Sequence, residues 1–160
     1  MIYLIGAIAT IVIGKPWLQP DAASANPTLD NAIALQIDNL KQSDNKWIEI
    51  DLRDQQLFAW SGEEQTFSSV VSTGKAKTPT YPGIYAIQRK YPQDRMRGRD
   101  YDIPDVPHVL YFDRGYALHG AYWHNSFGTP ISHGCINLPI DYAQQLFDWA
   151  EIGTTVIIHE

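Results

Sequence analysis

Residues 132–137 read Ser-His-Gly-Cys-Ile-Asn and contain the only cysteine of the chain, Cys135. A second histidine, His119, lies upstream in the run Leu118-His119-Gly120. The thiolate is the reactive form of cysteine, and a neighbouring imidazole can raise its population at neutral pH. Gly134, directly before the thiol, permits the close backbone approach that an exposed nucleophile often needs. This stretch therefore favours a cysteine nucleophile with a histidine partner.

Two other interpretations of the cysteine must be weighed. A lone cysteine is most often an inert, buried, small apolar residue. Three histidines lie in the seventeen residues that end at Cys135 (His119, His124 and His133), and imidazoles also bind zinc. One sulfur and three scattered imidazoles match none of the usual paired spacings of zinc ligands, however. We therefore expect no metal ion and no cofactor, and a zinc hydrolase remains an alternative.

The composition indicates one globular domain with a short appendage. The chain has 160 residues, of which 44% are hydrophobic and 19% are charged, so it can bury a core of its own. Its formal net charge of −6 argues against a nucleic-acid partner, because binding phosphates requires clustered cations. The one basic cluster, Arg95-Met96-Arg97-Gly98-Arg99, is interpreted as a solvated loop.

The first 25 residues resemble a leader segment. An apolar run from Ile2 to Ile13 is followed by a polar stretch and then by Ala23-Ser24-Ala25, which is typical of a signal peptide cleaved after Ala25. No Lys or Arg precedes the run, so a retained membrane anchor through residues 1–14 stays open. Either way we expect export to the periplasm or cell wall. Structural cysteines there usually occur in pairs, so an unpaired Cys135 indicates a reactive thiol.

The hydrophobic pattern predicts a mainly β fold after a short helix or linker at residues 26–45. The domain itself is expected at residues 46–160. Its predicted strands fall at residues 47–52, 57–60, 67–71, 84–87, 106–112, 115–118 and 154–158. One apolar stripe predicts a helix at residues 139–150, with Gly153 as its stop. We expect a β-sandwich or partly closed barrel of mixed strands with one or two packed helices, and His119 at the end of a strand.

These motifs together resemble a known family. With His119-Gly120, the run from Ser132 to Asn137, and the loop Thr78-Pro79-Thr80, the chain resembles the L,D-transpeptidase catalytic domain (YkuD-like) family of peptidoglycan cross-linking enzymes. The resemblance extends from about Lys46 to His159. One departure is that the family's Pro-Thr-Gly reads Pro79-Thr80-Tyr81-Pro82-Gly83 here. This difference would reshape one wall of the cleft without changing the chemistry.

The resemblance implies an exported acyltransferase whose donor and acceptor are peptidoglycan stem peptides. Cys135 would attack a stem-peptide carbonyl, expel D-alanine and carry the acyl group as a thioester. His119 would act as general base and then general acid, and the backbone carbonyl of Gly120 would orient its ring. An acceptor amine would then form the cross-link. Water as the acceptor would make the enzyme an L,D-carboxypeptidase.

The remaining candidate residues support the loop or line the cleft. Loop support and oxyanion stabilisation are assigned to Ser132, His133, Gly134 and Asn137. Substrate contacts are assigned to Tyr81, Tyr101, Tyr122, Trp123 and His124. A non-catalytic wall-binding protein is a further alternative, but it would not need His119 and Cys135 together. The sequence assigns no oligomeric state.

Overall fold

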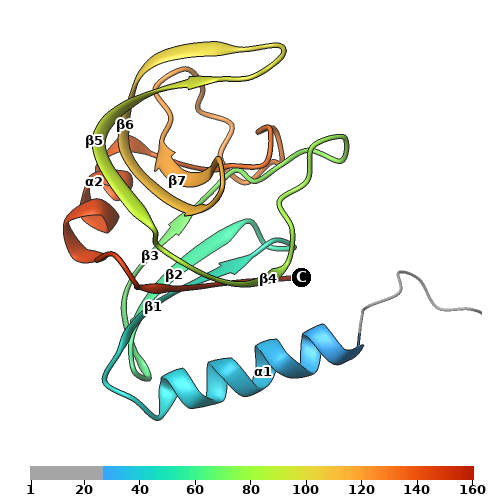
Figure 1. Cartoon of the computed structure of the whole chain (residues 1–160), viewed down its shortest axis with the longest axis vertical. Coiled ribbons are helices and arrows are strands. Elements are labelled where there is room, and N and C mark those ends of the chain that lie inside the picture. Colours follow the sequence, from blue (N-terminus) through green and yellow to red (C-terminus); the bar gives the residue numbers. More distant parts are fainter. Residues whose placement is uncertain (1–26) are drawn as a thin grey trace, which may run out of the picture.

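A computed structural model describes residues 27–160 (Figure 1). The predicted leader, residues 1–25, and the anchor considered at residues 1–14 lie outside the described residues. Within residues 27–160, no helix is both long enough and apolar enough to span a bilayer.

Two sheets and two helices make up the described chain, which confirms the mainly β fold. The five-stranded sheet has the order β3-β2-β1-β9-β4, and the four-stranded sheet has the order β5-β6-β7-β8. Both are mixed, since β1 runs parallel to β9 and β7 runs parallel to β8. The elements in chain order are α1 (Pro27–Lys41), β1 (Lys46–Asp51), β2 (Gln56–Ser61), β3 (Glu64–Val70), β4 (Gly83–Ala86), β5 (Arg89–Arg97), β6 (Asp102–Asp113), β7 (Tyr116–Gly120), β8 (Ile136–Leu138), α2 (Ile140–Trp149) and β9 (Thr155–His159).

The main core lies between the two sheets and α2. Alternating residues of β1 and β2 point inward, as the period of two in a half-buried strand requires. They meet apolar side chains from β6, β7, β8 and α2. The fully buried members include Ile48, Ile50, Leu57, Leu110, Leu118, Ile136 and Leu146.

Helix α1 covers the other face of the five-stranded sheet (Figure 1). Its apolar side chains Ile33 and Leu40 are buried against Trp47 of β1 and Ile157 of β9. The segment interpreted from sequence as a short helix or linker thus contains a helix of 15 residues. This helix lies on the opposite side of the sheet from the four-stranded sheet (Figure 1).

The structure corrects the interpretation of the basic cluster as a loop. Strand β5 runs through the cluster as far as Arg97 and pairs with β6. Met96 is buried, whereas the side chains on either side of it are exposed and form ion pairs with Asp102: the Arg95 guanidinium at 2.6 Å and that of Arg97 at 3.4 Å. Polar–apolar–polar alternation of this kind is typical of a strand that has one solvated face.

Candidate active site

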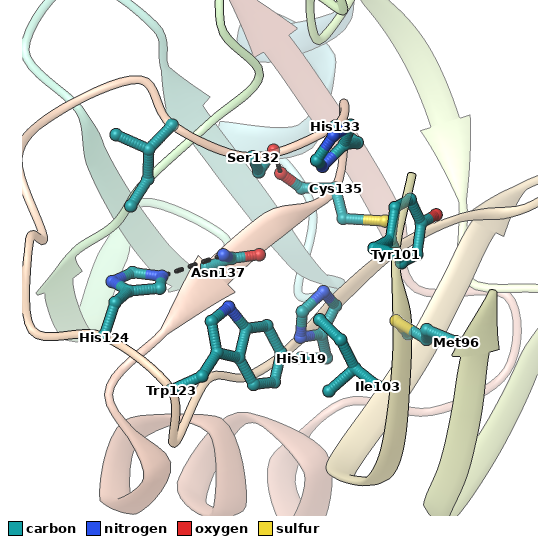
Figure 2. A pocket seen from close by; sticks show the side chains of 11 residues that line it. Met96, Tyr101, Ile103, His119, Trp123, His124, Ser132, His133, Cys135 and Asn137 are labelled. Atoms are coloured by element: carbon teal, nitrogen blue, oxygen red, sulfur yellow. Dashed lines mark hydrogen bonds between the residues drawn. The ribbon is translucent and has the colours of Figure 1, made fainter. Parts of the chain in front are cut away.

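A pocket of about 300 Å³ opens beside the cysteine and is lined in part by residues from all four strands of the four-stranded sheet (Figure 2). None of the described residues that line it is an Asp, Glu, Lys or Arg. Its walls come from the β5–β6 hairpin, β7, the segment after β7 and the loop before β8. The lining side chains are those of Met96, Tyr101, Ile103, His119, Trp123, His124, Ile131, Ser132, His133, Cys135 and Asn137.

The parallel pairing of β7 with β8 brings the histidine and the cysteine to one place. Register pairs His119 with Asn137, and Leu118 with Ile136. Cys135 immediately precedes β8, so its side chain lies next to the strand that carries His119. Both side chains face the pocket (Figure 2). The short β7–β8 pairing thus brings together His119 and Cys135, which are separated in the sequence.

The turn before the cysteine tolerates no side chain at Gly134. Its φ is +110°, and a Cβ there would lie 2.3 Å from the ring of Tyr116. The Ser132 hydroxyl accepts a hydrogen bond from the Gly134 N–H at 3.0 Å and donates one to the carbonyl of Cys135. The Thr80 hydroxyl donates to the Gly134 carbonyl at 2.8 Å. These contacts hold the loop of residues 132–135, which carries the candidate nucleophile, in a single shape.

The Cys135 thiol is protonated at neutral pH. Burial raises the pKa of this thiol to about 11, because the surroundings disfavour a thiolate charge. The thiol points toward the carbonyl of Gly115, with 3.8 Å between sulfur and oxygen.

His119 is neutral as well. The residue is only 2% exposed, and burial lowers the pKa of its imidazole to about 4. Its Nδ1 lies 3.0 Å from the carbonyl oxygen of Gly120. Because a carbonyl can only accept, Nδ1 carries the proton and Nε2 is left as an acceptor. At rest the two groups are thus a thiol and a neutral imidazole. The sequence suggested that a neighbouring imidazole could raise the thiolate population, but a neutral His119 does not do so.

Three of the five aromatic residues predicted as substrate contacts line the pocket. The Tyr101 ring lies 4.8 Å from the ring of His133, and the Trp123 ring lies 5.7 Å from that of His119. His124 contacts the amide of Asn137 at 2.9 Å (Figure 2). These side chains form a mostly aromatic wall around the sulfur.

The other two predicted contacts lie outside this lining. Tyr122 is half exposed and donates its hydroxyl proton to the carbonyl of Pro104 at 2.7 Å. Tyr81 is 58% exposed and borders a small depression on the other side of Gly134, next to Tyr85. The structure therefore separates Tyr81 from the Cys135 pocket by the nucleophile loop itself.

Sequence reasoning missed three apolar lining residues, Met96, Ile103 and Ile131. Two of them lie on the β5–β6 hairpin, in parts that the sequence analysis left without a strand, since it predicted only residues 106–112 of β6. The alternation around Met96 was the available signal, since an apolar residue between two arginines indicates one buried strand face. No comparable signal marks Ile131, which lies in a loop.

Within residues 27–160, no three His, Cys, Asp or Glu side chains are grouped so as to hold a metal ion. His119, His133 and Cys135, the set considered for zinc, do share one pocket. The Nε2 of His133 lies 3.2 Å from the Lys75 ammonium. Because this nitrogen already faces a positive charge, it is poorly placed to bind a metal cation.

Comparison with known proteins assigns the family. Residues 45–158, which include the whole pocket, match the YkuD family, described as the L,D-transpeptidase catalytic domain. The chain belongs to this family. The match begins after α1, so this L,D-transpeptidase catalytic domain comprises both sheets and α2.

Relatives of known structure or curated name support the same conclusion. An Escherichia coli protein named probable L,D-transpeptidase ErfK/SrfK is 33% identical over 92 residues, which cover 52% of this chain and 29% of that protein. An L,D-transpeptidase from Mycobacterium smegmatis superposes with a TM-score of 0.68 and 26% identity, covering 72% of this chain and 59% of that one. The catalytic domain of the Enterococcus faecium enzyme gives 0.66 and 27%, covering 72% of this chain and 98% of that domain.

The chain spans less than a third of the curated relative and about three fifths of the mycobacterial one. It covers nearly all of the isolated E. faecium catalytic domain. The likeness therefore concerns the catalytic domain of these relatives.

Proposed function

We propose that the protein is a peptidoglycan L,D-transpeptidase that uses Cys135 as its acyl carrier. The observation that carries this proposal is the convergence of Cys135 and the His119–Gly120 pair in one uncharged pocket of a domain of this family. The donor is a stem peptide ending in D-alanine, and the acceptor is the side-chain amine of a second stem peptide.

The first half-reaction forms a thioester. The Cys135 thiol passes its proton to Nε2 of His119 as the sulfur attacks the carbonyl carbon of the donor. The C–N bond to D-alanine then breaks, and His119 returns the proton to the departing nitrogen. Gly120 supports both steps, because its carbonyl fixes the tautomer that leaves Nε2 free to accept.

The oxyanion is stabilised by the backbone of the nucleophile loop. The Gly134 N–H is already donated to the Ser132 hydroxyl, which leaves the Cys135 N–H as the donor that we propose. Loss of one such donor costs about 3 kcal/mol of transition-state stabilisation in well-studied hydrolases. In this proposal, Ser132 and His133 contribute by fixing the conformation of the loop that carries Cys135.

The second half-reaction resolves the thioester. His119 accepts a proton from the incoming amine as its nitrogen attacks the thioester carbon. The C–S bond then breaks, and His119 returns the proton to the sulfur, which regenerates the Cys135 thiol. If water enters instead, the same chemistry yields a shortened peptide and not a cross-link. The products therefore distinguish transpeptidation from carboxypeptidation.

The proposal includes delivery to the cell wall. Residues 1–25 would act as an export signal or, through residues 1–14, as an anchor, and residues 46–160 would form the catalytic domain. Export would bring the thiol into the compartment where peptidoglycan lies. No nucleic-acid partner is proposed.

The decisive experiment is intact-mass analysis after incubation with a carbapenem and, separately, with a disaccharide-tetrapeptide. We expect a covalent adduct on the wild type that is absent from Cys135→Ala, and a cross-linked dimer from the natural donor. A folded wild type that forms neither adduct nor product refutes the function. Activity that disappears with chelators and returns with zinc would establish the zinc hydrolase instead.

A further inference from the structure

A lysine lies at the edge of the uncharged pocket. The ammonium of Lys75 lies 3.2 Å from Nε2 of His133, a residue that lines the pocket beside Cys135. An ammonium can only donate, so this contact uses one of its three N–H groups. Within residues 27–160, Lys75 has no ion-pair partner, which leaves two N–H groups available for an incoming anion.

The position of Lys75 is fixed relative to the nucleophile. Its backbone N–H donates to the Ser132 carbonyl at 3.2 Å, and its own carbonyl accepts from the Thr78 N–H at 2.8 Å. The Thr78 hydroxyl donates to the same Ser132 carbonyl at 3.0 Å. Gly74 precedes it where a Cβ would lie 2.2 Å from the Thr78 carbonyl oxygen, so the turn is tightly closed. The turn that carries Lys75 is thereby held on the loop that carries Cys135.

Two cations of the β5–β6 hairpin on the opposite wall are already paired with a carboxylate. Arg95 and Arg97 of β5 share the carboxylate of Asp102. Their hairpin also supplies Tyr101, whose ring packs at a tilt against the ring of His133, close to the sulfur of Cys135 (Figure 2). An anion that enters the pocket past His133 therefore meets Lys75 as a cation without a carboxylate partner.

We propose that Lys75 binds the terminal carboxylate of the donor peptide and so selects donors that end in a free D-amino acid. This inference rests on the proposed function, in which the residue expelled carries an α-carboxylate next to the attacked bond. Lys75 does not line the pocket itself, but its ammonium contacts His133, which does, so it can meet a carboxylate that leaves the pocket past His133. Charge-assisted hydrogen bonds of this kind are the stronger class. Lys75 is then a specificity residue, and it takes no part in the bond changes.

The test measures peptide binding in Cys135→Ala, where no turnover occurs. The probes are a stem tetrapeptide with a free terminal carboxylate and the same peptide with a terminal carboxamide. We expect the acid to bind about tenfold more tightly than the amide, as for one charge-assisted hydrogen bond at a partly solvated site. Adding Lys75→Met should bring this ratio to about one, and Lys75→Arg should keep most of it.

Lys77→Met is the matched control, because Lys77 is an exposed lysine on the same turn. It should leave the ratio unchanged, and thermal melting of each variant checks the fold. A ratio that Lys75→Met does not alter, or an acid peptide that does not bind at all, overturns the inference. Binding that depends on Lys75 in a wild type that forms no product refutes the proposed function alone. Product formation with an unaltered ratio refutes the role of Lys75 alone.

Discussion

At the scale of single residues, the candidate site is built from two uncharged groups. Cys135 holds its proton because a buried thiolate is poorly solvated, and His119 lacks one because a buried imidazolium is poorly solvated too. Burial thus raises the pKa of the thiol and lowers the pKa of the imidazole, so the two groups do not form a thiolate–imidazolium pair at rest. In the proposed mechanism, deprotonation of the thiol therefore accompanies attack, with His119 as the base.

The pH dependence of Cys135 alkylation tests this arrangement. The rate of reaction with iodoacetamide should rise about tenfold per pH unit from pH 7 upward and approach a plateau only near pH 11, because the thiolate alone reacts. The same protein in denaturant serves as the control, with a midpoint near the ordinary value of about 8.5. A plateau already at pH 7 would show a preformed thiolate and contradict general-base activation.

The placement of His119 and Cys135 in one pocket could be predicted because few residue types suit a nucleophile and its base. A lone thiol after a glycine, with histidines nearby, is an uncommon combination, and His119 and Cys135 do share a pocket. Substrate contacts are different, because any aromatic side chain can serve either a wall or a core. Nothing in the sequence around Tyr101 and Tyr122 distinguishes a substrate contact. In the structure Tyr101 lines the pocket, whereas Tyr122 lies outside it and donates a hydrogen bond to the carbonyl of Pro104 on β6.

At the scale of elements, the β5–β6 hairpin decides the shape of the pocket. It contributes Met96, Tyr101 and Ile103, and its turn is tight at Gly98, whose N–H donates to the Tyr101 carbonyl at 2.9 Å. A Cβ at Gly98 would lie 2.2 Å from the Tyr101 ring. The absence of a side chain there allows the ring to fold back over the turn toward His133.

Gly98→Val should therefore act on the site through Tyr101. The added side chain pushes the ring away from His133, and we expect acylation of Cys135 by a carbapenem to slow about tenfold while the melting temperature changes little. Stopped-flow fluorescence would measure the rate. The control is a double-mutant cycle: Gly98→Val should have no further effect in a Tyr101→Ala background. Independent, additive effects would show that Gly98 acts by another route.

Strands with a clear apolar period were predictable, and those without one were not. Strands β1, β2 and β9 have inward-facing apolar residues and were expected close to their observed positions. Strand β5 is mostly exposed and polar and alternates only around Met96, and β8 has only three residues, so the hydrophobic pattern of each is too short to predict the whole strand. Both are stabilised by their partners β6 and β7, which is information that a local window of sequence lacks.

At the scale of the whole molecule, the sequence did not decide between a sandwich and a partly closed barrel, and the structure has two distinct sheets.

One cross-strand contact links the stability of the five-stranded sheet to pH. His159 of β9 lies 3.0 Å from the carboxylate of Glu49 on β1, which also accepts from the indole of Trp60 at 2.8 Å. The hydrogen bond to Glu49 raises the pKa of His159 above its usual 6.5.

This contact should make the protein less stable as the pH rises above neutrality. A raised pKa in the folded state means that the stabilisation is complete below about pH 6.5 and is lost as His159 gives up its proton. Melting temperatures across pH 6 to 9 should therefore decline in the wild type. Glu49→Gln, which keeps an acceptor for Trp60, should decline less over that range. Parallel curves for the two proteins would exclude this contact as the cause.

The placement of β9 also has a consequence for the order in which the protein folds. This strand lies between β1 and β4, although it comes last of the described strands in sequence. The β1–β2–β3 meander can form from local contacts, but β4 has no partner in the sheet until β9 arrives. A chain in which β9 has not yet paired would expose the open edge of β1, a site for unwanted pairing. We infer that the risk of aggregation during folding is concentrated in the interval before β9 pairs.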